Sequence, residues 1–168
     1  MAVKTIVIYP DPILKAACAP VDRIDPDVLQ LLEDLVDTML AGPGSVGVAA
    51  PQIGVPLRVC VVDVSKNRHG KENNHGRLLM VNPEIVGSSG SAVMREGCMS
   101  VPDYTGDVER ATEVTLRFSE PDGTQREFCA TGFEAIAIQH EMDHLDGLLF
   151  LDRITSLKTG LFRRKSYK

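Results

Sequence analysis

Apolar residues recur at intervals of three and four in two stretches of the chain, and these predict the helices. The first stretch follows Asp25 and Pro26, where Asp can cap the free amides and Pro is tolerated at the first helical position. It ends before Gly42. The second covers residues 132–145 and ends before Gly147. We therefore expect an N-terminal helix and a second, equally well-patterned helix near the C-terminus.

Short apolar runs separated by Pro, Gly and polar residues predict strands between the two helices. Two alternating segments flank the turn sequence Pro121-Asp122-Gly123, which predicts a β-hairpin. The fold class is α+β, with mixed or antiparallel strands forming a partly open sheet around the second helix and a short C-terminal tail. The expected strands are residues 46–50, 57–64, 78–81, 112–118 and 124–130, and residues 65–77 form an exposed loop.

Composition narrows the class of protein. The 168 residues are 43% hydrophobic and contain no linker or repeat, so we expect one domain over residues 1–168. A net charge of -5 leaves no broad basic surface, so nucleic acid is not expected as a direct substrate. The basic residues of the tail are expected to be a solvated terminus: Arg163, Arg164, Lys165 and Lys168.

The N-terminus and the cysteines indicate where the protein works. The apolar run at residues 6–9 is too short for the core of a signal peptide or for a membrane span. The four cysteines show no Cys-x-x-Cys spacing. We expect a cytoplasmic protein with free thiols and no membrane association.

Residues 140–144 read H-E-x-x-H within the second helix. Residues four apart lie one turn above each other, so His140 and His144 can face one cation while Glu141 reaches a water molecule on it. The pentapeptide also occurs by chance on ordinary helices. On its own, it indicates a metal hydrolase without establishing one.

A catalytic metal needs a third protein ligand, and the sequence places it upstream. No Glu follows Glu141 and no His follows His144, which excludes the usual zincin and metzincin arrangements. Cys98 is favoured because it follows Gly97, which permits a close backbone approach. The other candidates are expected to be core or solvated residues: Cys60 and Cys129 in strands, Cys18 in an early loop, and His69 and His75 in the polar loop.

A third stretch, residues 45–52, combines small residues with one amide side chain. Small residues let a substrate backbone lie close, and Gln52 can donate to a developing oxyanion. Alone, such a stretch is more often simple packing.

Together the three stretches resemble the motifs of the peptide deformylase family, in the same order along the chain. The family motifs G-x-G-x-A-A-x-Q, E-G-C-x-S and Q-H-E-x-D-H correspond to residues 45–52, 96–100 and 139–144. Residues 9–14, 82–83 and 108–110 are also similar to the family. One position departs from the motif, because Ser45 stands where the family has Gly. If that position needs positive φ, Ser would cost about 1 kcal/mol.

The resemblance implies a site. Cys98, His140 and His144 would bind one divalent metal ion, Fe(II) natively, with Zn(II), Ni(II) or Co(II) able to replace it. Glu141 would be the acid and base of the reaction, and Gln52 and the backbone amide of Met99 would hold the formyl oxygen. Glu96 and Arg110 are expected to pair and to hold the Cys98 loop. The residues expected to contact substrate are Val46, Gly47, Gly97, Phe133, Ile136 and Ala137.

The implied activity is removal of the N-formyl group from the formyl-methionine of newly synthesised proteins, with release of formate. Nascent polypeptides near the ribosomal exit tunnel would be the partners, and a monomer is expected. Three alternatives stay open: a related protein with weakened activity, a small H-E-x-x-H metallopeptidase, and a structural zinc site. The last would want a fourth protein ligand, which the sequence does not offer near the motifs.

Overall fold

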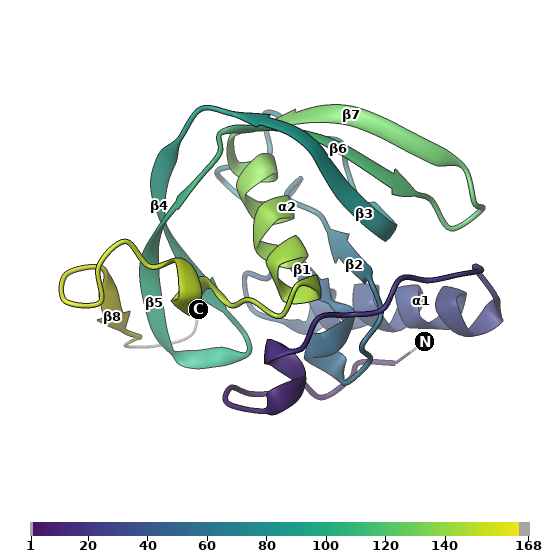
Figure 1. Cartoon of the computed structure of the whole chain (residues 1–168), viewed down its shortest axis with the longest axis horizontal. Coiled ribbons are helices and arrows are strands. Elements are labelled where there is room, and N and C mark those ends of the chain that lie inside the picture. Colours follow the sequence, from purple (N-terminus) through teal and green to yellow (C-terminus); the bar gives the residue numbers. More distant parts are fainter. Residues whose placement is uncertain (1, 165–168) are drawn as a thin grey trace.

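The computed structural model describes residues 2–164 and places α2 between two antiparallel sheets (Figure 1). The five-stranded sheet has the order β1-β2-β3-β6-β7 and the three-stranded sheet the order β4-β5-β8. The elements are α1 (Pro26–Ala41), α2 (Gly132–Leu145), η1 (Pro12–Lys15), η2 (Ala50–Ile53), η3 (Phe150–Arg153), β1 (Gly47–Ala49), β2 (Val59–Val62), β3 (Leu78–Ser89), β4 (Ala92–Cys98), β5 (Val101–Arg110), β6 (Glu113–Ser119), β7 (Gln125–Thr131) and β8 (Leu161–Arg163).

The two helices begin and end where the sequence predicts. The Asp25 side chain accepts a hydrogen bond from the Val28 amide at 3.0 Å, and α1 ends before Gly42. Gly147 follows α2 with φ of 78°, and a Cβ at this position would lie 2.7 Å from the Lys15 carbonyl oxygen. Only glycine fits this turn, because both the backbone conformation and the close approach exclude a side chain.

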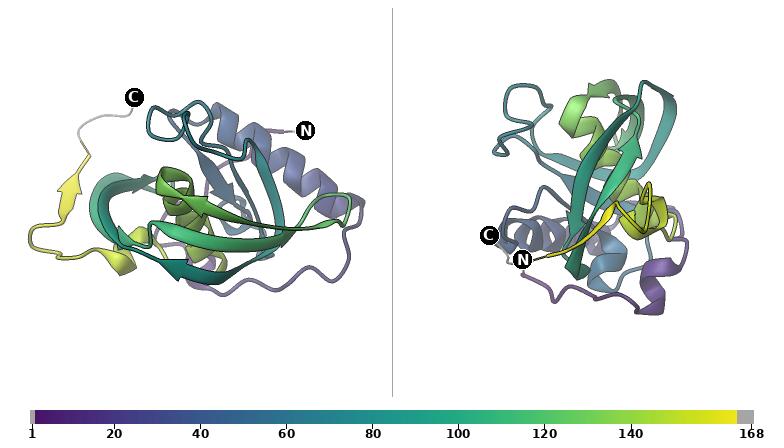
Figure 2. Two further views of the ribbon diagram at one scale, coloured as in Figure 1. Left: turned by 90° about the horizontal axis from the view of Figure 1, so that it is seen from above. Right: turned by 90° about the vertical axis from the view of Figure 1, so that its left-hand side faces the viewer.

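Packing encloses α2 on more than one side. One core cluster joins its apolar residues, such as Ile138 and Leu145, to Leu116 and Phe118 of the large sheet. A second cluster packs α1 against β1 and β2. Figure 2 shows the long strands of the large sheet curving over α2, with β8 at the opposite end of the molecule from the β6–β7 turn. The arrangement confirms the α+β class and leaves α2 at the centre.

Three strands were not predicted. β4 and β5 form a hairpin, and β8 lies within the segment that the sequence indicates as a tail, paired antiparallel with β5. Arg164, directly after β8, is therefore not a solvated tail residue, and Lys165 and Lys168 lie outside the described residues. Cys129 on β7 is exposed, so its prediction as a core residue was wrong, whereas Cys18 and Cys60 are buried.

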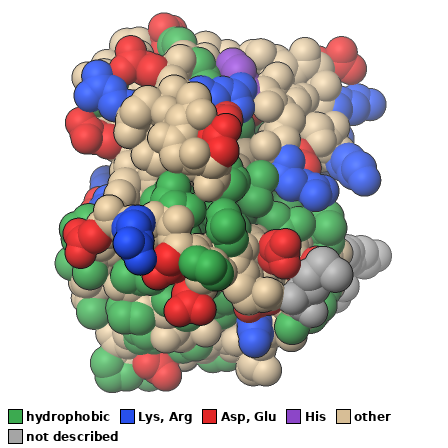
Figure 3. All heavy atoms as spheres, turned by 90° about the vertical axis from the view of Figure 1, so that its right-hand side faces the viewer, with side chains coloured by type: hydrophobic (Ala, Val, Ile, Leu, Met, Phe, Trp, Pro, Cys, Tyr) green, Lys and Arg blue, Asp and Glu red, His purple; other side chains and the backbone are tan. Residues whose placement is uncertain are grey.

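The surface agrees with the modest negative charge. On the face drawn in Figure 3, Lys and Arg side chains lie among Asp and Glu side chains, with apolar areas between them. Within residues 2–164, no helix is long and apolar enough to cross a membrane.

Candidate metal centre and active site

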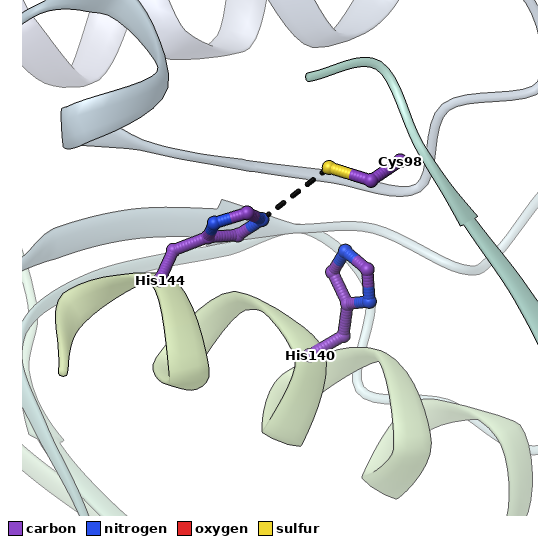
Figure 4. Close-up of side chains that lie close together, drawn as sticks. All are labelled: Cys98, His140 and His144. Carbon is purple, nitrogen blue, oxygen red and sulfur yellow. Dashed lines mark hydrogen bonds between the residues drawn. The ribbon is translucent and has the colours of Figure 1, made fainter. Parts of the chain in front are cut away.

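Three side chains from two distant parts of the chain converge on one point. Ligand atoms of Cys98, His140 and His144 all lie within 4.8 Å of one another. The Cys98 sulfur is 3.4 Å from His144 Nε2, and Figure 4 shows a ring nitrogen of His140 pointing toward the same sulfur. One thiolate and two imidazoles form a donor set that suits a borderline divalent cation.

Local structure explains this convergence. His140 and His144 lie one turn apart on α2, so their rings project from the same side of the helix. Cys98 is the last residue of β4, where the register with β5 is irregular and the chain turns through Met99 and Ser100. The hairpin end therefore holds the sulfur over the helix.

A chain of buried ion pairs fixes the His140 ring. Its Nδ1 lies 2.8 Å from Glu96 Oε1, which leaves Nε2 for the site. Arg110 donates to both Glu96 oxygens at 2.5 and 2.9 Å, and to Asp143 at 2.9 Å. Arg153 closes the chain with two hydrogen bonds to Asp143. The expected pairing of Glu96 with Arg110 is thus present in the structure.

The electrostatics of this cluster favour a positive charge at its centre. Burial alone would raise the pKa of Glu96, but hydrogen bonds from His140 and Arg110 lower it to about 2. Burial alone would lower the pKa of His140, yet the Cys98 sulfur and Glu96 raise it well above its ordinary value. A position that favours a proton also favours a cation. Burial and the charge of His140 lower the pKa of His144, which keeps it neutral, as a ligand must be.

Glu141 lies beside the convergence point and is buried. Its Oε2 is 4.0 Å from His140 Nε2, and its Oε1 is buried with no hydrogen-bond partner among residues 2–164. Burial raises the pKa of Glu141 to about 7. A carboxyl group in this range can both accept and return a proton at neutral pH.

Gly47 on β1 leaves the space that Glu141 fills. A Cβ at this position would lie 2.8 Å from both Cγ and Oε2 of Glu141. The glycine of this motif is therefore needed to make room for the Glu141 carboxylate of α2. Ser45, the departure from that motif, does not have positive φ, and its hydroxyl donates to the Gly47 carbonyl at 3.3 Å.

The Gln52 amide is held in one orientation. Its Oε1 accepts from the Ala49 amide at 3.0 Å, so its Nε2 points to Ser100 Oγ at 3.0 Å and to the Cys98 sulfur at 3.4 Å. The structure thus brings Gln52 to the convergence point. Ser100 was not singled out from the sequence, although it ends the quoted E-G-C-x-S motif. Asp143 lies within the quoted Q-H-E-x-D-H motif, whereas no sequence pattern marked Arg153.

A cavity of about 310 Å³ opens beside these groups. Its walls include Glu141, Cys98, Gln52 and all six residues expected to contact substrate, which are Val46, Gly47, Gly97, Phe133, Ile136 and Ala137. The Met99 side chain also lines it and packs closely on Gly42. Asn67 and Arg164 also line the cavity and were not predicted to do so.

The polar loop of residues 65–77 is attached to α2. His75 Nδ1 lies 2.6 Å from Glu134 Oε1, and the ring stacks on Phe128 with centroids 3.8 Å apart. His75 is exposed, as expected for the polar loop, but its contacts with Glu134 and Phe128 were not predicted. His69 is exposed and lies beside Phe133 with ring centroids 5.6 Å apart.

Comparisons with known proteins agree with this geometry. A family model described as polypeptide deformylase matches residues 3–160. The chain is 41% identical to a peptide deformylase of Syntrophobacter fumaroxidans over 98% of this chain and 94% of that protein. It is 44% identical to a peptide deformylase of Phenylobacterium zucineum over 94% of this chain and 91% of that protein.

Solved structures of the same name superpose closely. A class I type b peptide deformylase of Acinetobacter baumannii, bound to Met-Ala-Ser, gives a TM-score of 0.83 at 36% identity, covering 91% of this chain and 99% of that chain. The peptide deformylase of Ehrlichia chaffeensis in complex with actinonin gives a TM-score of 0.87 at 33% identity, covering 94% of this chain and 92% of that chain.

Proposed function

The chain belongs to the polypeptide deformylase family, and on this premise we propose how its own residues perform the deformylation of nascent peptides. The family and the hydrolase activity predicted from the sequence are confirmed by the comparisons. The proposal assigns a role to each residue that converges on the cavity. The observation that carries it is the buried Glu141 beside three side chains that could bind a metal ion and that come from two distant elements.

We propose that Cys98, His140 and His144 hold one divalent cation, and that the native ion is Fe(II). When bound, such a cation would act as a Lewis acid and would lower the pKa of a water molecule toward neutral pH. The thiolate of Cys98 would donate more charge than a third imidazole, and the same ligands could also bind Zn(II), Ni(II) or Co(II).

The sheet edges define where the peptide lies. β1 is an edge strand of the large sheet and β4 an edge strand of the small one, and residues of both line the cavity. An extended peptide can pair with such edges through its backbone. The methionine side chain then enters the apolar part of the wall made by Phe133, Ile136 and Ala137. The A. baumannii relative binds the peptide Met-Ala-Ser, which supports a peptide as the ligand of this cavity.

Proton transfer is the role of Glu141. It accepts a proton as water attacks the formyl carbon, and its pKa of about 7 suits this task at neutral pH. Charge grows on the formyl oxygen, where Gln52 Nε2 and the Met99 amide donate hydrogen bonds. Glu141 then gives the proton to the nitrogen as the C–N bond breaks. The products are formate and a free N-terminal amine.

We further propose a cytoplasmic monomer that meets its substrates near the ribosomal exit tunnel. Nascent formylated chains are made there, and every residue assigned to the reaction belongs to one chain.

Replacement of Glu141 tests the proposed function. In Glu141→Gln, formate release from formyl-Met-Ala-Ser should fall by about 100- to 10,000-fold, because the proton acceptor is lost. The metal content and the midpoint of urea unfolding should be the same as in the wild type. Glu33→Gln, an exposed position on α1, is the matched control and should keep full activity. Retention of turnover in Glu141→Gln, or equal cleavage of unformylated peptides by the wild type, would refute the assignment.

Aeration tests the native metal. A thiolate ligand makes an Fe(II) site vulnerable to oxygen and peroxide. Protein purified without air should contain iron and lose activity on aeration, whereas a nickel-loaded sample should persist. Equal lifetimes of the two forms would contradict the proposal for iron.

A further inference from the structure

Arg164 is held at the cavity by the small sheet. It follows β8, which pairs with β5 through Arg163 opposite Tyr104, and its own amide donates to the Asp103 carbonyl at 2.7 Å. The backbone that carries its side chain is therefore fixed to the same hairpin that carries Cys98. This attachment explains why a residue so near the end of the chain lines the cavity.

The guanidinium of Arg164 lies directly over Gly97. A Cβ added to Gly97 would collide with Arg164 Nη2, and the next nearest atoms belong to Arg164 and Thr105 at 3.4 Å. Gly97 precedes Cys98 on β4, the edge strand on which an extended peptide can pair. Because Gly97 has no side chain, the Arg164 side chain can lie beside the expected path of the peptide.

Several charged side chains line the cavity. Arg95, also in the wall, lies 3.6 Å from Asp107 and stacks on the Phe162 ring at 3.5 Å. The carboxylate of Glu96 is paired with Arg110, and Glu141 lies at the reacting end. The guanidinium of Arg164 adds positive charge to the wall beside Gly97, one residue before Cys98 on β4.

We propose that Arg164 is a specificity-determining residue that favours formylated peptides with an acidic side chain at the second or third residue. The inference rests on the proposed function. A guanidinium binds a carboxylate through two parallel hydrogen bonds, and a partly buried setting screens this pair less than open solvent does. The pair forms in the substrate complex, remote from the formyl group, so it acts on KM.

A matched peptide series measures the effect. The substrates are C-terminal amides, so that no terminal carboxylate contributes: formyl-Met-Ala-Glu against formyl-Met-Ala-Gln, and formyl-Met-Glu-Ala against formyl-Met-Gln-Ala. For wild-type enzyme, kcat/KM of the Glu peptide should exceed that of its Gln partner by about fivefold in at least one pair, through KM. The ratio should shrink at 0.5 M salt.

Variants assign the preference to one side chain. In Arg164→Ala the Glu-to-Gln ratio should fall to near one, in Arg164→Lys it should be partly retained, and in Arg164→Glu it should drop below one. Arg163→Ala, exposed on the same strand, is the matched control and should keep the wild-type ratio. Thermal midpoints show that β8 is intact in each variant.

The outcomes separate this inference from the proposed function. A wild-type ratio near one, or a ratio unchanged in Arg164→Ala, would overturn the role of Arg164 while formate release stands. A failure of the wild type to release formate from the Gln peptides would instead overturn the proposed function.

Discussion

The two α-helices use burial differently. α1 buries one mainly apolar stripe, including Leu32 and Leu35, while Leu29 and Leu40 remain exposed. α2 buries eleven of its fourteen residues, so no broad face remains for solvent. Five of the buried residues can carry charge, and these are Glu134, His140, Glu141, Asp143 and His144. α1 therefore contributes mainly apolar packing to the core. α2 is surrounded by the rest of the protein and carries the side chains assigned to the site.

The partners of α2 explain how it tolerates this burial. Glu134 binds His75 of the polar loop, His140 binds Glu96 of β4, and Asp143 binds Arg110 and Arg153. Burying a charge is costly unless it is paired, so each pair is needed for α2 to remain inside. Glu141 is held less tightly: its Oε2 lies 4.0 Å from His140 Nε2, its Oε1 has no hydrogen-bond partner among residues 2–164, and burial raises its pKa to about 7. This loosely held carboxylate is the one assigned to proton transfer.

Removal of Arg110 should have the largest effect on stability. Arg110→Met leaves Glu96 and Asp143 buried without this cation, so the free energy of unfolding should fall by about 3–5 kcal/mol, and metal should be retained less well. Urea unfolding and metal analysis measure both. Arg117→Met, which breaks the exposed pair with Glu127, is the matched control and should cost at most about 1 kcal/mol. Equal costs in the two variants would contradict the comparison.

Truncation inside the α1 stripe should destabilise the protein without touching the chemistry. Leu35 is fully buried, and Leu35→Ala should lower the free energy of unfolding by about 2–5 kcal/mol through the cavity it leaves. The kcat of the folded enzyme should be unchanged. Leu29→Ala, at a position 42% exposed, should change stability by no more than about 0.5 kcal/mol. A marked fall in kcat for Leu35→Ala would show that α1 also serves catalysis.

Crowding of Glu141 should reduce activity more than stability. In Gly47→Ala the new Cβ would displace the Glu141 side chain, and a misplacement of about 1 Å costs about 100-fold in rate. Gly87→Ala is the control, because its Cβ would meet nothing closer than 3.7 Å. Steady-state formate release and thermal melts separate the two effects. Similar rates for both variants would show that Glu141 has room to adjust.

The stability of the protein at acid pH should depend on Asp34, the one buried carboxylate of α1. Burial would raise the pKa of Asp34, but hydrogen bonding to Gln30 and the charge of Lys4 lower it below its ordinary value of 3.8. A lowered pKa stabilises the fold above pH 3.8, and this contribution is lost as the pH falls below that value. Asp34→Asn should therefore be modestly less stable at pH 6 and lose less between pH 5 and pH 3. Parallel urea midpoints of wild type and variant would count against this.

Much of the fold and part of the site followed from the sequence alone. The spacing of apolar residues and the capping residues determined α1 and α2, and Pro121-Asp122-Gly123 determined the β6–β7 hairpin. These features are local, because the apolar spacing of a helix and the residue types of a turn can be recognised within one short stretch of sequence. The pair of histidines on α2 was local in the same sense, and the family motifs supplied Cys98, Gln52 and Glu141.

Tertiary structure alone decided the rest. β4 has no apolar alternation to detect, since its buried positions are taken by Glu96 and Cys98. β8 is defined by its pairing with β5, and this pairing places Arg164 beside Gly97. The ion pairs of Asp143 with Arg110 and Arg153 were not predicted either, because the sequence motifs do not indicate which cations Asp143 meets. Such contacts depend on where distant segments meet, and only the packed chain determines that.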